Sequence, residues 1–150
     1  MSDTMNRNLL WLVIAMSVAF AACQVGPWGP LAASDEDARI VLEARGGAGP
    51  LRIGARCVTL LVEEVNREIT LVWRSGQTSW DPAVRQIVFD DATAGEIRSW
   101  DGERIEVGGA GIAEPGAADQ GAPQPKWLST PDNSCPDELF AVHSVMRIGQ

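Results

Sequence analysis

Short runs of strand-forming residues follow one another between residues 51 and 107, and Gly, Pro, Asn or Asp residues end most of them. Residues 68–74, with the sequence EITLVWR, alternate so that Ile69, Leu71 and Trp73 share one face. No long amphipathic helical pattern separates the runs, and this excludes an α/β fold, in which helices connect parallel strands. The sequence therefore predicts an all-β domain of short antiparallel strands.

The expected strands are residues 51–63, 68–74, 84–90, 96–100, 103–107 and 138–148. Asp101-Gly102 is a strong signal for a hairpin turn, and Gly54 predicts a bulge or a bend within its strand. Five to six such strands predict a small antiparallel barrel, OB-like or another Greek key.

The segments between the expected strands are rich in Gly and Pro. Residues 38–44 fit either a strand or a helical turn, whereas residues 46–50, GGAGP, predict a break in regular structure. Residues 75–82 predict a loop. Residues 108–136 predict a long Gly/Pro-rich surface loop within a barrel domain that spans residues 38–150.

The last expected strand is apolar on both faces, which favours a central position or a closed barrel. Simple alternation places Phe140 and Val142 on one face and His143 on the other, beside Ala141 and Val145. A histidine in this position is interpreted as structural. The alternative is a general base assisted by a nearby carboxylate.

The N-terminal residues 1–22 have the pattern of a secretory signal peptide. Arg7 precedes the uncharged, mostly apolar run Leu9–Ala22, which is shorter than the roughly 20 residues of a membrane-spanning helix. Cleavage after Ala19-Phe20-Ala21 would release a soluble protein, and a retained anchor is a third possibility.

Phe20-Ala21-Ala22-Cys23 resembles the lipobox of bacterial lipoproteins, with Phe20 where that family usually has Leu. The resemblance implies a diacylglyceryl group on Cys23 and a protein held at the cell membrane or the outer membrane. Residues 23–37 then predict a flexible lipidated tether, because Gly and Pro prevent regular structure and Asp35, Glu36 and Asp37 favour solvation. Trp28 is expected either at the lipid interface or packed back on the domain.

The chain has three cysteines. Export implies an oxidising compartment, in which an odd number of cysteines leaves one thiol unexplained. Acylation of Cys23 would leave Cys57 and Cys135 to form a disulfide, and the alternative is two separate buried thiols. These cysteines and a single histidine lack the spacing of a metal site, so neither a metal nor a cofactor is expected.

The formal net charge of −8 makes nucleic acid an unlikely partner, because phosphate backbones repel an acidic chain. Four tryptophans, Trp73, Trp80, Trp100 and Trp127, are many for a domain of this size. Trp80 and Trp127, both in expected loops, are the candidates for a ligand-binding face, for a glycan or a peptide. The alternative is loop packing by these two residues and core filling by Trp73 and Trp100.

Two acidic clusters supply oxygen ligands but lack a calcium-loop spacing. The first is Asp90-Asp91 with Glu96 and Asp101, and the second is residues 132–138. We interpret them as residues that cap turns and solvate loops. Two carboxylates at a fixed separation could also support glycoside hydrolysis, and this is the basis of an alternative function as an exported hydrolase.

The stretch from Cys57 to His143 resembles a domain of exported bacterial proteins of unknown function. The shared features are a Cys-led strand at 57–60, the LVW strand at 71–73, the loop at 78–82, a strand ending at Asp90, residues 101–109, and Cys135 before the last strand. The resemblance implies no catalytic role. The sequence thus predicts a non-enzymatic envelope lipoprotein whose β-domain interacts with the membrane through its anchor and with another envelope component.

Overall fold

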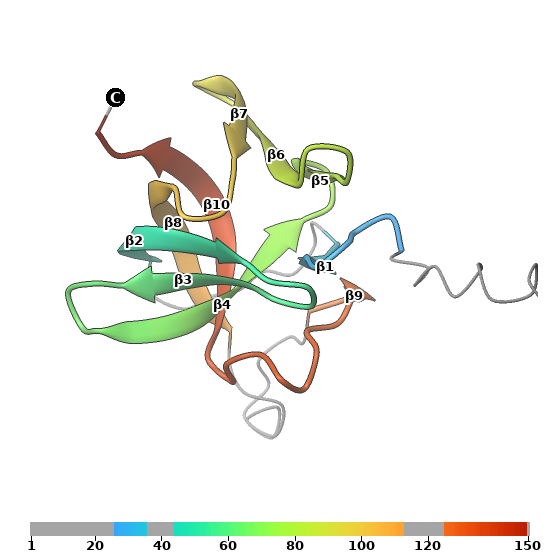
Figure 1. Cartoon of the computed structure of the whole chain (residues 1–150), viewed down its shortest axis with the longest axis horizontal. Coiled ribbons are helices and arrows are strands. Elements are labelled where there is room, and N and C mark those ends of the chain that lie inside the picture. Colours follow the sequence, from blue (N-terminus) through green and yellow to red (C-terminus); the bar gives the residue numbers. More distant parts are fainter. Residues whose placement is uncertain (1–25, 36–43, 113–124, 150) are drawn as a thin grey trace, which may run out of the picture.

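The computed structural model describes residues 26–35, 44–112 and 125–149 (Figure 1), and strands are its regular structure. Within these ranges no helix is long and apolar enough to cross a membrane. The strands are β1 (Ala32–Ser34), β2 (Ala44–Ile53), β3 (Val58–Val62), β4 (Arg67–Arg74), β5 (Thr78–Asp81), β6 (Gln86–Asp91), β7 (Gly95–Ser99), β8 (Arg104–Ile112), β9 (Trp127–Ser129) and β10 (Leu139–Arg147).

Five strands form a closed barrel in the order β2-β3-β4-β10-β8, and β8 returns to β2. Most neighbours are antiparallel, and the parallel pairing of β10 with β4 closes the barrel. Counted along the chain, the fifth barrel strand lies between the third and the fourth, which is the Greek-key order of an OB-fold barrel. The predicted all-β barrel is therefore confirmed.

A second, three-stranded antiparallel sheet, β5-β6-β7, is inserted between barrel strands β4 and β8. Its central strand contributes Ile87 and Phe89 to the same hydrophobic core as the barrel strands. Phe89 meets the ring of Trp73 edge to face, with 6.2 Å between the ring centroids. The expectation of a loop over residues 75–82 was wrong in part, because β5 forms there by pairing with β6.

Trp73 lies in the centre of the core, as one interpretation of the tryptophans predicted, but Trp100 does not. The side chain of Trp100 is exposed, and the guanidinium of Arg147 stacks on its ring at 5.0 Å from the centroid. This contact is a surface cation–π pair.

Strand β2 runs through the Gly-rich residues 46–50 that the sequence analysis interpreted as a break. Its first seven residues pair with β8, and residues 51–53 then pair with β3. One strand thus pairs with β8 over its first part and with β3 over its last part. Glycines permit the backbones of neighbouring strands to approach closely. The two GGAG sequences meet only at their first glycines, with Gly46 opposite Gly108.

Residues 51–63 form two strands and a turn where one long strand was expected. β2 ends at Ile53 and β3 begins at Val58. Between them the Gly54 N–H donates to the carbonyl of Cys57 at 2.9 Å, so Gly54 begins a tight hairpin turn.

The predicted surface loop at residues 108–136 is shorter than expected. β8 continues to Ile112, and Trp127–Ser129 forms β9, which pairs with β1. Residues 113–124 lie outside the described part of the chain.

The last part of the predicted tether is ordered. β1 pairs in parallel with residues 72–74 of β4, and residues 31–34 are buried. Trp28 packs against the hydrophobic core, which is one of the two positions expected for it. The segment from residue 26 to residue 35 therefore belongs to the folded domain, whereas the predicted signal peptide, Cys23 and most of residues 38–44 lie outside the described residues.

A β-bulge interrupts β10 at His143. Val142 pairs with Gly109 and Ser144 with Gly108, so His143 is the extra residue. Beyond the bulge the alternation is reversed. Val145 therefore joins Phe140 and Val142 in the core, and His143 is exposed. The prediction that His143 shares a face with Ala141 and Val145 was wrong for this reason.

Candidate functional site

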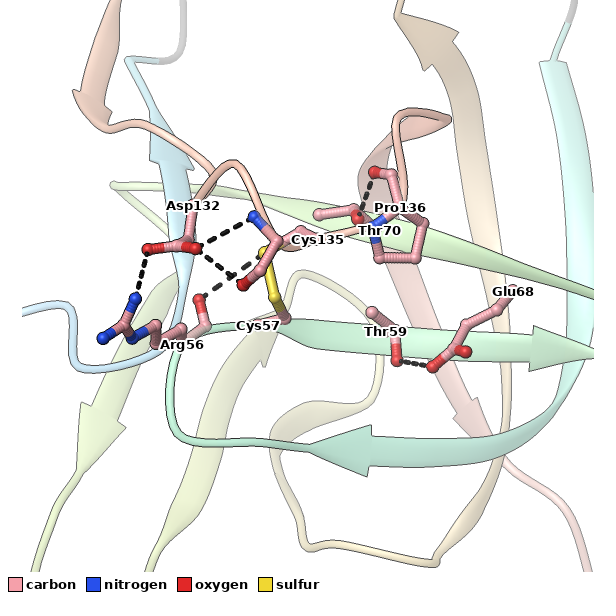
Figure 2. The surroundings of a disulfide bond; sticks show 9 residues. Arg56, Cys57, Thr59, Glu68, Thr70, Asp132, Cys135 and Pro136 are labelled. Atoms are coloured by element: carbon pink, nitrogen blue, oxygen red, sulfur yellow. Dashed lines mark hydrogen bonds and ion pairs between the residues drawn. A yellow bond between two sulfur atoms is a disulfide. The ribbon is translucent and has the colours of Figure 1, made fainter.

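A disulfide joins Cys57, at the end of the β2–β3 turn, to Cys135, in the loop before β10 (Figure 2). The two Cα atoms are 5.7 Å apart, and 78 positions of sequence separate the residues. The predicted pairing is confirmed, and the alternative of two separate thiols is wrong. The bridge connects the segments leading into β3 and β10, which flank β4 in the barrel and are not neighbours of each other.

We call residues 130–138 the disulfide loop, and hydrogen bonds within it and to β4 hold its shape. Near its start, the Asp132 carboxylate accepts hydrogen bonds from the Ser134 hydroxyl at 2.6 Å and the Ser134 N–H at 2.9 Å. At its end, the hydroxyl of Thr70 in β4 donates to the Pro136 carbonyl at 2.7 Å. Figure 2 shows how the disulfide lies between these contacts. The loop is therefore a fixed part of the barrel surface.

The charge of Asp132 is stabilised by its surroundings. The hydrogen bond from the Ser134 hydroxyl lowers the pKa of Asp132 most, followed by the Ser134 N–H, and the Arg56 guanidinium, with 3.5 Å between Nη1 and Oδ2, lowers it further. This carboxylate is therefore ionised at neutral pH.

Two open cavities lie on either side of the disulfide loop. The smaller has a volume of about 420 Å³, and Trp127, Pro131 and Leu139 form its apolar wall. The larger has a volume of about 620 Å³. Both are lined by Cys135 and by its neighbours Asn133, Pro136 and Asp137. The disulfide thus positions the wall that separates the two cavities.

The larger cavity has a polar lining on three adjacent strands. Arg52 of β2, Thr59 of β3 and Glu68 of β4 line it, with the disulfide loop opposite. The Thr59 hydroxyl donates to one Glu68 oxygen at 2.5 Å, and the other oxygen lies 3.6 Å from the Arg52 guanidinium. Glu68 therefore has a partner for each oxygen, and this surface presents charges of both signs.

The structure places the two candidate tryptophans in different parts of the molecule. Trp127 begins β9, lines the smaller cavity and packs against a small cluster formed by Ala32, Val72 and Leu139. Trp80 lies in β5 and packs against the main core. Both were expected in loops, and both are in short strands instead.

Trp80 also holds the N-terminal turn of the domain. A Cβ atom built on Gly29 would lie 2.3 Å from the Trp80 ring, and Gly29 has a φ of +55°. Only glycine combines this backbone conformation with such a close contact. The position of Trp80 therefore supports a packing role, and Trp127 is the candidate that borders a cavity.

Of the other candidate residues for chemistry, His143, Asp91 and Asp101 do not line the two cavities, whereas Asp137 lines both. Partial desolvation lowers the pKa of His143, and the charge of Arg74 lowers it further, so His143 is neutral at pH 7. The Asp91 carboxylate accepts N–H groups of Ala94 and Thr93 in the β6–β7 turn, and Asp101 accepts the Ile53 N–H at 2.7 Å. Across the described ranges, His, Cys, Asp and Glu form no group of three or more that could hold a metal ion.

The sequence pattern does not indicate the polar residues of the larger cavity, Arg52, Thr59 and Glu68. Each lies in a predicted strand, but alternation along the single expected strand 51–63 would place Arg52 and Thr59 on opposite faces. The turn between β2 and β3 brings them to the same surface. Their meeting with the disulfide loop depends on barrel closure, which the local sequence does not show.

Comparison with protein-family models, curated proteins and solved structures gave no significant match for this chain. The residues described above are therefore the basis for a functional proposal.

Proposed function

We propose that the chain is an exported lipoprotein, anchored through acylated Cys23, whose barrel binds another envelope component without catalysing a reaction. The observation that carries this proposal is the Cys57–Cys135 disulfide. It accounts for two of the three cysteines and leaves Cys23, directly behind Phe20-Ala21-Ala22, for modification.

The disulfide also supports export. Stable disulfides form in oxidising compartments such as the periplasm and the cell surface, and they are rare in the cytosol. A diacylglyceryl group with a third acyl chain would hold the protein at a membrane, because two or more chains anchor stably where one binds reversibly.

The smaller cavity supports binding as the role of the domain. Trp127 and Leu139 offer an apolar wall, and the backbone of the disulfide loop offers polar groups beside it. Ligand sites commonly combine aromatic side chains with a few fixed polar groups. A polymer or a protein segment of the envelope fits this open site better than a small enclosed molecule does.

Two carboxylates that line the cavities, those of Asp132 and Glu68, favour binding over the alternative of an exported hydrolase. Glycoside hydrolysis requires a carboxylic acid whose pKa is raised, so that it can protonate the leaving group. The pKa of Asp132 is lowered instead, by Ser134 and Arg56. Glu68, in the other cavity, is held by Thr59 and Arg52.

Replacement of Cys23 by alanine tests the anchor. We expect the unaltered protein to fractionate with membranes as a mature chain that begins at an acylated Cys23, and the Cys23→Ala variant to lose both the acyl groups and the membrane association. Intact-mass analysis of membrane and soluble fractions measures this. As a matched control, Phe20→Leu restores the usual lipobox residue and should preserve acylation. A mature chain that begins at another residue and carries no lipid would contradict the proposal.

A photo-cross-linking residue in place of Trp127 tests the binding site. In intact cells we expect cross-linking at position 127 to give a discrete adduct with an envelope component. The same residue in place of Trp100, which is exposed beside Arg147, is the matched control and should not give this adduct. Equal cross-linking at both positions, or none at position 127, would count against a binding site at the smaller cavity.

A further inference from the structure

The turn that begins the described domain is fixed to the barrel. The Gly29 N–H donates to the Gly26 carbonyl at 2.9 Å, and the Leu31 N–H donates to the Trp28 carbonyl at 2.9 Å. Trp28 and Leu31 both pack into the main core, and Leu31 is 1% exposed. Trp80 covers Gly29. Residues 26–35 are therefore held in one position on the barrel.

Only a short length of chain separates this turn from the cysteine that we propose to be acylated. Three peptide units connect Cys23 to Gly26, and three successive Cα–Cα steps span at most about 11 Å. A flexible tether over all of residues 23–37 would have allowed the domain to rotate freely above a bilayer. A connection of about 11 Å between the lipid and a packed turn restricts that rotation strongly.

In Figure 1 the turn lies at the right-hand end of the described domain, near β1 and β9. Gly26 and Pro27 are exposed there, and on β9, which pairs with β1, the Leu128 side chain is 47% exposed. The β3–β4 turn, which carries Val65, lies at the opposite end in Figure 1.

The two ends of the domain also differ in charge. The sequence from Cys23 to Ser34 has no charged residue, whereas the β3–β4 turn includes Glu63 and Glu64. Bacterial and other membranes with anionic lipids repel acidic groups near their surface. At the end with β1 and β9, Asp35 pairs with Lys126 at 3.1 Å, so these two charges offset each other. At the other end Arg104 pairs with Glu63, and Glu64 adds a further negative charge, so that end approaches an anionic surface at a higher electrostatic cost.

We propose that the end formed by Gly26, Pro27 and Leu128 lies against the surface of the bilayer that holds the acyl chains, with the β3–β4 turn directed away from it. This orientation rests on the proposed function, because it requires the lipid on Cys23. It also brings Trp127, next to Leu128 in β9, close to the membrane. A partner at the smaller cavity would then be bound near the bilayer.

Site-specific fluorescence quenching tests the orientation. Leu128→Cys and Val65→Cys each add a single free thiol, since the other cysteines are either acylated or in the disulfide. The acylated proteins, labelled with bimane, are placed in vesicles of phosphatidylethanolamine and phosphatidylglycerol that contain a lipid with a nitroxide on its headgroup. We expect several-fold stronger quenching at position 128 than at position 65. Pro27→Cys provides a second membrane-facing site if the first variant folds poorly.

A longer connection serves as the matched control. Insertion of a 20-residue Gly/Ser linker between Val25 and Gly26 keeps the lipid but gives a root-mean-square reach of about 25 Å. The difference in quenching between the two positions should then largely disappear. Equal quenching in the chain without the linker, with acylation verified by intact mass, would overturn the orientation alone. A chain without acyl groups would overturn the anchor and this orientation together.

Discussion

Replacement of both Cys57 and Cys135 by alanine is expected to lower the free energy of unfolding by about 4 kcal/mol. In the chain-entropy model, the disulfide closes a long loop and removes many conformations from the unfolded state. The residues it joins are 78 positions apart, which places the expected effect in the upper part of the usual range. Alanine is chosen because Cys135 is buried and serine would bring a hydroxyl into that site.

Urea unfolding of the soluble Cys23→Ala form, with and without the two further substitutions, measures this difference. Reduction of the parent protein under the same conditions is the matched comparison and should give a similar loss. The remaining contacts of the disulfide loop, such as the hydrogen bond from Thr70 to Pro136, are expected to keep its path in the variant. A loss of unfolding free energy below about 1 kcal/mol would mean that the disulfide does not restrict the unfolded chain as the chain-entropy model requires.

The strands with a clear local pattern were predictable from the sequence. Residues 68–74 alternate between apolar and polar, and β4 occupies residues 67–74. Asp101-Gly102 predicted a hairpin turn, and a turn does form there, with Gly102 at a φ of +82° before β8 begins at Arg104. The hairpin itself was wrong, because β7 pairs with β6 and β8 pairs with β2 and β10, so the two strands belong to different sheets. Turn residues and alternation act over a few residues, so the sequence shows them directly.

Features that depend on distant partners were not predictable. β9 is three residues long, and it exists because Ala33 and Ser34 of β1 pair with it. The bulge at His143 also depends on a distant partner. Val142 and Ser144 pair with two adjacent glycines of β8, and this pairing leaves His143 as the extra residue. A strand pattern read from one segment contains no information about such register shifts.

The candidate site was only partly predictable, because some of its features depend on pairing between distant segments. The Cys57–Cys135 pair was predictable, because it follows from the number of cysteines and from an oxidising compartment. The cavities were not predictable, since Arg52 and Glu68 come from early strands and the disulfide loop from residues 130–138. Barrel closure through β4 and β10 brings them together.

The glycines of β2 lead to the second prediction with a large effect on stability. A Cβ atom at Gly49 would lie 1.9 Å from the carbonyl oxygen of Leu61 in β3. That oxygen belongs to the backbone of a neighbouring barrel strand, so a small side-chain movement cannot relieve the overlap. Gly49→Ala must therefore displace β2 from β3 at the bend where β2 passes from one partner to the next.

We expect Gly49→Ala to lower the free energy of unfolding by about 2–3 kcal/mol, the upper part of the range for overpacked sites. Gly46→Ala is the matched control in the same strand, because a Cβ there meets only the Val107 carbonyl oxygen at 3.5 Å, an ordinary contact. The Gly46 variant should be neutral or slightly more stable, since alanine reduces the conformational freedom of the unfolded chain. Urea unfolding of both variants measures the contrast. Equal stability of the two would show that β2 and β3 are not in such close contact at Gly49, and that GGAGP interrupts the strand as its composition alone predicts.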